Sequence, residues 1–290
     1  MVVPKLKFIR TLWGAEAQFS TDINVLLAEI HRLGYAGVEV TLSDIHRVSA
    51  NDPDAFHRAL KAHQLELVGL AQTNYPTYKD GTWQDLPIDQ HITNLDIHLK
   101  EFLPYNPIHI NIQGGQDSWS REENEEFIEK ALQVQAKYPQ LTASHETHRT
   151  RVLYNPFITA HLIKRFPNLR ITADYSHFVL VCERLLNDAT DDERFRLFAS
   201  RVDHLHARVG TAEHPQISNP RESPMECEQM QRWWEMIWDA QKDREWITLV
   251  PEYGPAPYAM TADIDVWALT NQEMERQKKN YDQWASKNQK

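Results

Sequence analysis

The sequence predicts an α/β protein built as a single (β/α)₈ barrel, and three observations support this. Eight short apolar segments alternate with segments of helical spacing along the 290 residues. The length suits one such barrel, which typically needs about 250 residues. No glycine-rich phosphate loop follows the first strand, although an open nucleotide-binding sheet normally has one. We therefore expect one domain over residues 1–290, ending in a polar helix at about 272–290.

The first half of the chain predicts four pairs of strand and helix. In the helix expected at 22–33, leucine and isoleucine recur on one face, and Gly34 is a suitable C-cap. Ser120 and Glu123 have the spacing of a capping box and begin the fourth helix. The expected strands are 7–14, 37–42, 65–70 and 108–112, and the other expected helices are 53–63 and 88–103.

The second half repeats this alternation. Asn155 followed by Pro156 predicts the start of a helix that ends at Pro167. A final helix is expected at 263–286, and its second half is too polar to be buried throughout. The expected strands are 141–144, 169–173, 202–209 and 246–250. Strands that alternate with helices in this way favour a parallel barrel.

Composition excludes several classes of protein. The chain has 41 acidic and 31 basic residues, and a formal charge of −10 repels phosphate groups. Its cysteines, Cys182 and Cys227, are too few for a disulfide framework. Its first residues lack the apolar run of a signal peptide, and no stretch is long enough to cross a bilayer. We expect a cytoplasmic protein with a small-molecule substrate and no nucleic-acid or membrane partner; a homo-oligomer is an open alternative.

Four residues of the kind that bind metals follow strands in the second half of the chain. They are Glu146, Asp174, His206 and Glu252. The C-terminal ends of parallel barrel strands meet at one mouth, so these side chains are expected to converge there. Three carboxylates and one imidazole suit Mn²⁺, Mg²⁺ or Co²⁺ and tolerate Zn²⁺. The sequence therefore predicts one divalent metal ion at the C-terminal face, without choosing among these metals.

Each of these candidates also has a simpler interpretation. Glu146 resembles a surface glutamate that forms a salt bridge with Arg149 or Arg151. His204 and His206 alternate along one strand and so share a face, where a hydrogen-bonded core histidine is the common alternative. The residues alone do not decide which of these two histidines is the ligand. The group of four is stronger evidence than any one member.

These motifs resemble those of the xylose-isomerase-like barrel superfamily, which includes sugar isomerases, ketose 3-epimerases, inosose dehydratases and apurinic endonucleases. The resembling motifs, at the ends of strands five to eight, are Glu146-x-His148, Asp174-x-x-His177, His206 and Glu252. The resemblance implies that Glu146, Asp174, His206 and Glu252 bind the metal, with Mn²⁺ as the first candidate. It also implies that Glu146 and Glu252 are the catalytic acid and base.

Further residues are expected to contact the substrate. Glu39 resembles a strand-two glutamate that lies near the substrate in this superfamily. Arg208 shares a strand face with His206 and can clamp a carboxylate or phosphate; a structural ion pair with Glu213 or Glu222 is the alternative. The full expected set is His177, Arg208, Glu39, His148, Trp13 and His109.

Aromatic and basic residues near the mouth complete the expected site. Tyr175 and Tyr253 are expected to line the pocket with Trp13, although a buried core position is the commoner role of such residues. Together with Arg208, the arginines Arg149 and Arg151 indicate an acidic substrate.

The sequence departs from two branches of the superfamily. Ketose epimerases have an arginine six residues after the strand-seven histidine, where this chain has Ala212. Apurinic endonucleases need an Asp-x-His after strand seven, and no aspartate precedes His214 in this way.

We therefore expect a metal-dependent isomerase or epimerase of a small polyhydroxylated keto compound, acting by proton abstraction through a metal-stabilised enediolate. A lyase that dehydrates an inosose-like or cyclic keto acid is the alternative. A phosphodiesterase-type hydrolase and a non-catalytic metal-binding barrel are less favoured.

Overall fold

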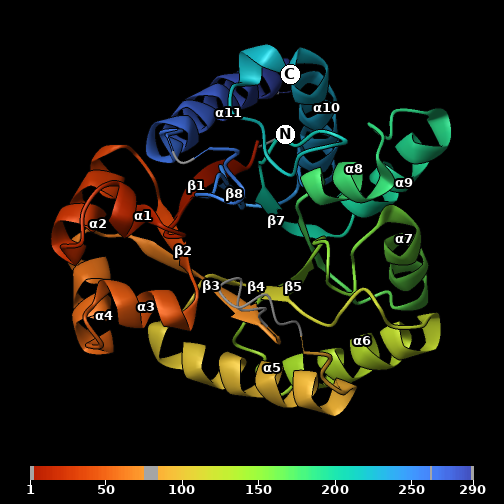
Figure 1. Cartoon of the computed structure of the whole chain (residues 1–290), viewed down its shortest axis with the longest axis horizontal. Helices are drawn as coiled ribbons and strands as arrows, with labels where there is room; N and C mark the ends of the chain where they lie inside the picture. The colour runs from red at the N-terminus through yellow and green to blue at the C-terminus, as the bar shows by residue number, and fades with distance from the viewer. Residues whose placement is uncertain (1–2, 75–83, 262, 289–290) are drawn as a thin grey trace.

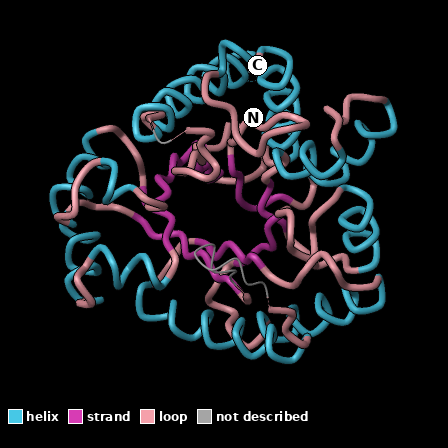
Figure 2. The backbone as a smooth tube through the Cα atoms, viewed as in Figure 1, coloured by secondary structure: helices cyan, strands magenta, loops and turns pink. Residues whose placement is uncertain are grey.

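Eight parallel strands form a closed barrel in the computed structural model, which describes residues 3–74, 84–261 and 263–288. Each strand pairs with the next along the chain, and β8 pairs with β1 to close the ring. Figure 2 shows the strands as an inner ring surrounded by helices. The strands are β1 (Lys5–Thr11), β2 (Gly37–Val40), β3 (Glu66–Gln72), β4 (His109–Gln113), β5 (Ala143–Glu146), β6 (Ile171–Ala173), β7 (Val202–His206) and β8 (Trp246–Val250). The predicted (β/α)₈ fold is confirmed.

The helices cover the outside of the barrel (Figure 1). They are α1 (Ala15–Gln18), α2 (Ile23–Arg32), α3 (Leu42–Val48), α4 (Pro53–Ala62), α5 (Ile88–Phe102), α6 (Arg121–Gln135), α7 (Pro156–Arg165), α8 (Ser176–Cys182), α9 (Ala189–Ala199), α10 (Pro224–Ala240) and α11 (Val266–Asn288). Within the described part of the chain, no helix combines the length and hydropathy that a bilayer crossing requires.

Local sequence signals set several helix boundaries. The Asn155 side chain accepts from the backbone N–H groups at the start of α7, and Pro156 takes the first helical position. The predicted capping box of Ser120 and Glu123 is present at the start of α6. Gly34, just after α2, has the positive φ of 91° that glycine adopts without strain. Each of these signals depends only on residues close to it in the chain, so the helix ends lie where the sequence predicts them.

Several elements differ from the expected boundaries, among them the first strand, expected at 7–14 and observed at Lys5–Thr11, and the second and seventh strands. The second strand was expected to reach residue 42, but it ends at Val40 because Thr41 and Asp44 form a capping box that starts α3. The seventh strand was expected to reach residue 209 and ends at His206. In both cases the chain leaves the sheet earlier than its apolar pattern indicates.

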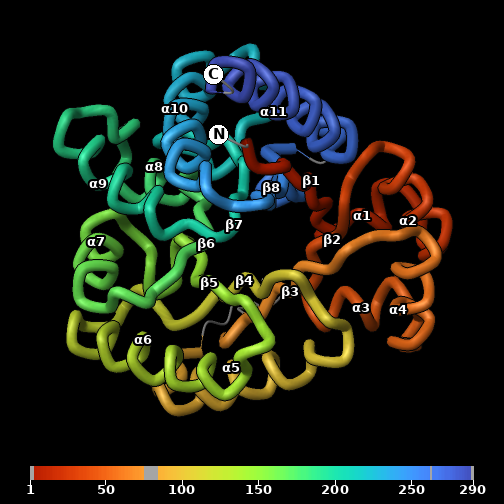
Figure 3. The backbone as a smooth tube through the Cα atoms, turned by 180° about the vertical axis from the view of Figure 1, so that it is seen from behind, coloured from red at the N-terminus to blue at the C-terminus, as the bar shows by residue number. Residues whose placement is uncertain are grey.

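The last helix, α11, lies beside α10 (Figures 1 and 3). Its polar second half still buries Tyr281 and Trp284. The ring of Tyr281 packs edge-on against Trp238 of α10 at 5.0 Å, and the Trp284 indole N–H donates to Asp239 at 3.1 Å. The polar residues of this segment therefore form only one side of a helix whose other side is packed.

Candidate metal and catalytic site

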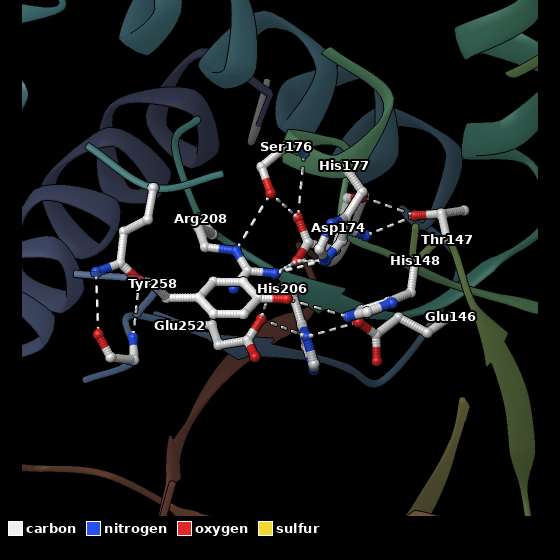
Figure 4. Close-up of polar contacts among 12 residues, drawn as sticks. Glu146, Thr147, His148, Asp174, Ser176, His177, His206, Arg208, Glu252 and Tyr258 are labelled. Carbon is white, nitrogen blue, oxygen red and sulfur yellow. Dashed lines mark hydrogen bonds and ion pairs between the residues drawn. The ribbon is translucent and has the colours of Figure 1, made fainter. Parts of the chain in front are cut away.

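The four expected metal ligands meet at the mouth of the barrel, the C-terminal end of the strands (Figure 4). One ligand atom from each of Glu146, Asp174, His206 and Glu252 lies within 4.8 Å of the other three, and all four residues are buried. Atoms bound to one ion at 2.0–2.6 Å are at most about 5 Å apart. The separation therefore suits ligands of a single ion.

His206, rather than His204, faces these carboxylates. Its Nδ1 atom is 2.8 Å from Glu252 Oε2 and 3.9 Å from Glu146 Oε1. His204 lies two residues earlier on the same face, deeper in the barrel, where its Nδ1 contacts Thr248 Oγ1 at 2.7 Å. The two histidines therefore lie in successive layers of side chains inside the barrel.

The donor atoms of this cluster fit a divalent cation. Glu146 Oε1, His206 Nδ1 and Glu252 Oε2 are buried and lack a hydrogen-bond partner of suitable geometry among the described residues. Such atoms lose their contacts with water and gain nothing in return unless a proton or a cation lies between them. Three carboxylates with one imidazole are the donors that Mn²⁺ or Mg²⁺ prefers, and Zn²⁺ accepts them.

Amide side chains on two strands of the other half of the barrel hold Glu146 in place. Asn111 Nδ2 and Gln113 Nε2 donate to Glu146 Oε2 at 2.7 Å and 2.9 Å. Gln72 Nε2 in turn donates to Gln113 Oε1 at 3.0 Å. Gln113 and Gln72 were not among the site residues predicted from the sequence. The alternation of side chains along β4 could have indicated Gln113, because every second residue of a strand points to the same side of the sheet.

Arg208 enters the same carboxylate cluster. Its Nη2 donates to Asp174 Oδ2 and contacts His177 Nε2 at 2.7 Å, and it lies 3.6 Å from Glu252 Oε2. The Nε group points to Ser176 Oγ at 3.2 Å. Within the described structure, Nη1 has no hydrogen-bond partner. In the structure Arg208 forms an ion pair with Asp174, and not with the alternative partners expected from the sequence, Glu213 and Glu222.

A cavity of about 630 Å³ opens beside this cluster. Most of the expected substrate-binding residues line it: Trp13, Glu39, His148 and Arg208. His177 lies behind Arg208, with its ring 4.0 Å from that of His148. His109 is one layer deeper, where its Nε2 contacts Ser144 Oγ at 2.7 Å. The cavity is also lined by Gln113, Arg151, Glu252 and Tyr258.

The expectation that Tyr175 and Tyr253 line the pocket is wrong. Both are buried, and Tyr175 packs edge-on against Phe195 at 4.8 Å in the layer between the strands and the helices. Each tyrosine directly follows an inward-facing carboxylate, Asp174 or Glu252. Adjacent side chains point to opposite sides of the sheet, so the tyrosines face outward.

Tyr258 forms a wall of the cavity that the sequence did not reveal. Its ring lies 4.9 Å from the Arg208 guanidinium and 5.0 Å from that of Arg149. Trp13 packs against it edge-on at 4.9 Å. Its hydroxyl lies 3.5 Å from His148 Nε2. The residue belongs to a loop after β8, where no strand or helix pattern indicates which way a side chain points.

The two candidate catalytic carboxylates have pKa values shifted in opposite directions. Burial, together with the nearby charges of Glu252 and Asp174, raises the pKa of Glu146 to about 7. Burial also disfavours the ionised form of Glu252, but Arg208 and His206 outweigh it and lower the pKa of that carboxyl below its ordinary value. Two acids separated in this way suit opposite roles in proton transfer.

Solved structures share this fold. A D-tagatose 3-epimerase-like protein is 12% identical with a TM-score of 0.64, covering 97% of this chain and 99% of its own. A probable 3-DHS dehydratase, AsbF from Bacillus anthracis, is 14% identical with a TM-score of 0.59, covering 91% and 97%. D-psicose 3-epimerase from Clostridium cellulolyticum H10, solved with D-tagatose, is 12% identical with a TM-score of 0.57, covering 97% and 98%.

No family model matches the chain, and no curated protein matches it in sequence. The resemblance of the fold to xylose-isomerase-like barrels is confirmed by these structures. At such low identities the likeness concerns the fold and does not extend to the chemistry.

Proposed function

We propose that this chain is a divalent-metal-dependent enzyme that isomerises or epimerises a small polyhydroxylated keto compound, such as a sugar or sugar derivative. The observation that carries the proposal is the cluster of four buried metal-type ligands at the mouth of the barrel, which includes the two carboxylates Glu146 and Glu252. Glu146, Asp174, His206 and Glu252 would hold the ion. A bound divalent cation would polarise the substrate carbonyl and stabilise the negative charge formed on deprotonation.

The two glutamates divide the proton transfer between them. Glu252 is ionised near neutral pH because its pKa is lowered, so it is suited to accept a proton from the carbon next to the carbonyl. Glu146 is the second carboxylate, and in the metal-free protein its pKa is raised to about 7, so it is suited to return a proton. Asn111 and Gln113 fix Glu146 through Oε2 and leave Oε1 directed at the metal cluster. Reversal of these roles gives the reverse reaction.

Residues of the cavity would bind and orient the substrate. Arg208 has two Nη1 hydrogens without a partner among the described residues, and they are suited to donate to a substrate oxygen. His177 contacts the other nitrogen of the same guanidinium and so helps to hold it. Trp13 and Tyr258 offer aromatic surfaces for the C–H face of a sugar.

A dehydratase of a cyclic keto acid is the second candidate, and the buried arginines of the cavity favour it. Arg208 and Arg151 both line the cavity, and the guanidinium group matches a carboxylate in shape and charge. The first step is the same removal of a proton next to a carbonyl. The difference is that a hydroxyl group on the next carbon then leaves and takes up a proton, which Glu146 would donate, to form water.

Metal analysis and proton exchange test the proposal together. The purified protein and a Glu146→Gln/Glu252→Gln variant are compared for bound Mn, Mg, Co and Zn, with folding checked by circular dichroism. Glu213→Gln is the matched control, because Glu213 is an exposed glutamate on the loop after β7. We expect about one ion per chain in the parent and the control, and a clear loss in the double variant.

The metal-loaded proteins are then incubated in D₂O with D-tagatose, D-psicose, D-fructose, an inosose and 3-dehydroshikimate. Deuterium at the carbon next to the carbonyl, with the carbon and oxygen content kept, supports an isomerase or epimerase. Loss of water supports the dehydratase. A folded parent that binds no divalent ion after supplementation contradicts both.

A further inference from the structure

Glu39, on β2, accepts two imidazole contacts with a single oxygen. Its Oε2 lies 3.0 Å from His204 Nε2 and 3.1 Å from His206 Nε2. All three residues are buried, with Glu39 only 2% exposed. A carboxylate oxygen can only accept, so each contact requires a hydrogen on the imidazole nitrogen. Glu39 therefore places a proton on Nε2 of both rings.

The position of this proton decides which atom of His206 faces the metal cluster. An imidazole that binds a metal through one nitrogen keeps its N–H on the other, so a proton held on Nε2 leaves Nδ1 as the atom for the metal. That Nδ1 is the atom directed at Glu252 and Glu146, at 2.8 Å and 3.9 Å. Histidines that bind metals commonly donate their other N–H to a carboxylate, which fixes the ring and its tautomer.

We propose that Glu39 is a positioning residue of the metal centre, which fixes His206 as a ligand through Nδ1, and not the substrate ligand that its resemblance implies. The inference rests on the metal-binding part of the proposed function. His204 contacts the same oxygen of Glu39 through its own Nε2. The oxygen is thereby shared between one ring at the mouth and one ring beneath it.

A second geometry uses the same residues. Glu39, His204 and His206 each offer one atom close enough to the others to hold an ion of their own. That ion would have to replace both imidazole protons on Nε2. His206 would then bridge two ions, one at each ring nitrogen. Counting bound metal separates this arrangement from the proposed one.

The experiment compares Glu39→Gln with Thr248→Val by titrating the metal-free proteins with Mn²⁺ and Zn²⁺ in competition with a chelator. Glutamine keeps the size of the side chain and removes its charge, whereas valine at position 248 disturbs the same buried layer without touching His206. We expect Glu39→Gln to bind one ion about 10- to 100-fold more weakly than the parent. Thr248→Val should stay near the parent affinity.

A second measurement uses the parent alone, so it does not depend on the folding of a variant. In zinc-loaded, ¹⁵N-histidine-labelled protein, His206 should show a protonated Nε2 and a zinc-bound Nδ1. A zinc-bound Nε2 would overturn the proposal. So would a folded Glu39→Gln variant with parental metal affinity, including one with a raised KM, which indicates substrate binding.

The metal count gives the remaining outcomes. Two ions in the parent and one in Glu39→Gln would make Glu39 a ligand and also overturn the proposal. A parent that binds no ion contradicts the proposed function itself, and it is recognised before any variant is compared.

Discussion

The two ends of the barrel treat buried carboxylates in different ways. At the closed N-terminal end, Asp203 at the start of β7 receives hydrogen bonds from Arg170 at 3.0 Å and 2.6 Å and also pairs with Arg244. At the mouth, one arginine, Arg208, pairs with two carboxylates of the metal cluster, Asp174 and Glu252. The first group therefore has two arginines for one carboxylate, and the second has one arginine for two carboxylates.

The difference shows in the pKa values of the two ends. Arg170 and Arg244 outweigh the effect of burial and lower the pKa of Asp203. Burial raises the pKa of Glu146 to about 7. A carboxylate whose charge is matched stabilises the folded state, whereas an unmatched one costs stability unless a cation binds. At the mouth, this loss of stability remains in the metal-free protein. The proposed site for cation binding and proton transfer requires such an unmatched charge.

The largest expected effect is on turnover. Replacement of Glu252 by Gln should lower kcat at least about 100-fold, because it removes the ionised carboxylate that accepts the proton. Asp203→Asn, at the other end of the barrel, should keep the parental kcat. Initial rates of deuterium exchange measure both variants. Equal losses in the two would mean that the ends do not differ in role.

The second effect is on stability and should appear at the closed end. Asp203→Asn should lower the free energy of unfolding by about 1–2 kcal/mol, because two partly exposed arginines lose a charged acceptor. Urea unfolding followed by circular dichroism measures the change. A loss below about 0.3 kcal/mol would place this cluster among ordinary surface ion pairs.

At the mouth, the corresponding change should have the opposite sign. Glu146→Gln should stabilise the metal-free protein at pH 8 by on the order of 1 kcal/mol, because it removes a buried charge whose pKa is already raised. The amide oxygen of glutamine can still accept from Asn111 and Gln113. Thermal unfolding in the presence of a chelator tests this. A destabilised variant would show that the charge of Glu146 is matched after all.

The smallest effect is the pH dependence of these two differences. The stability from Asp203 is present above its unfolded pKa of about 3.9, and it is lost as the pH falls through the lower folded value. The penalty from Glu146 is absent below about pH 4, grows between about pH 4 and 7, and stays constant above that range. Melting temperatures from pH 3 to 8 should therefore converge with the parent in acid for both variants.

The fold was predictable from local signals. Apolar strand segments, the Ser120 and Asn155 caps and the glycine after α2 act within a few residues, so one sequence is enough to recognise them. Two of the missed elements were short or polar: α3 has seven residues and begins at a capping box directly after a strand, and α9 (Ala189–Ala199) has five charged residues among its eleven. Their place depends on packing rather than on apolar spacing.

The site was predictable only where strand direction controls the side chain. Glu146 and His206 are the last residues of their strands, Asp174 and Glu252 follow theirs within two residues, and the barrel brings the four together. Tyr258 lies in a loop, whose path depends on contacts such as the packing of Gly254 beneath Trp13. Sequence patterns do not report contacts of that kind.

The closure of the barrel by β1 and β8 also sets when the site can form during synthesis. Lys5–Phe8 pairs with Trp246–Leu249, so the pairing of β1 with β8 cannot form until almost the whole chain has left the ribosome. The last of the proposed metal ligands, Glu252, emerges just after that partner strand. A nascent chain therefore cannot present the full proposed ligand set before the ring is able to close. In the proposed function, metal loading is a reaction of the finished barrel.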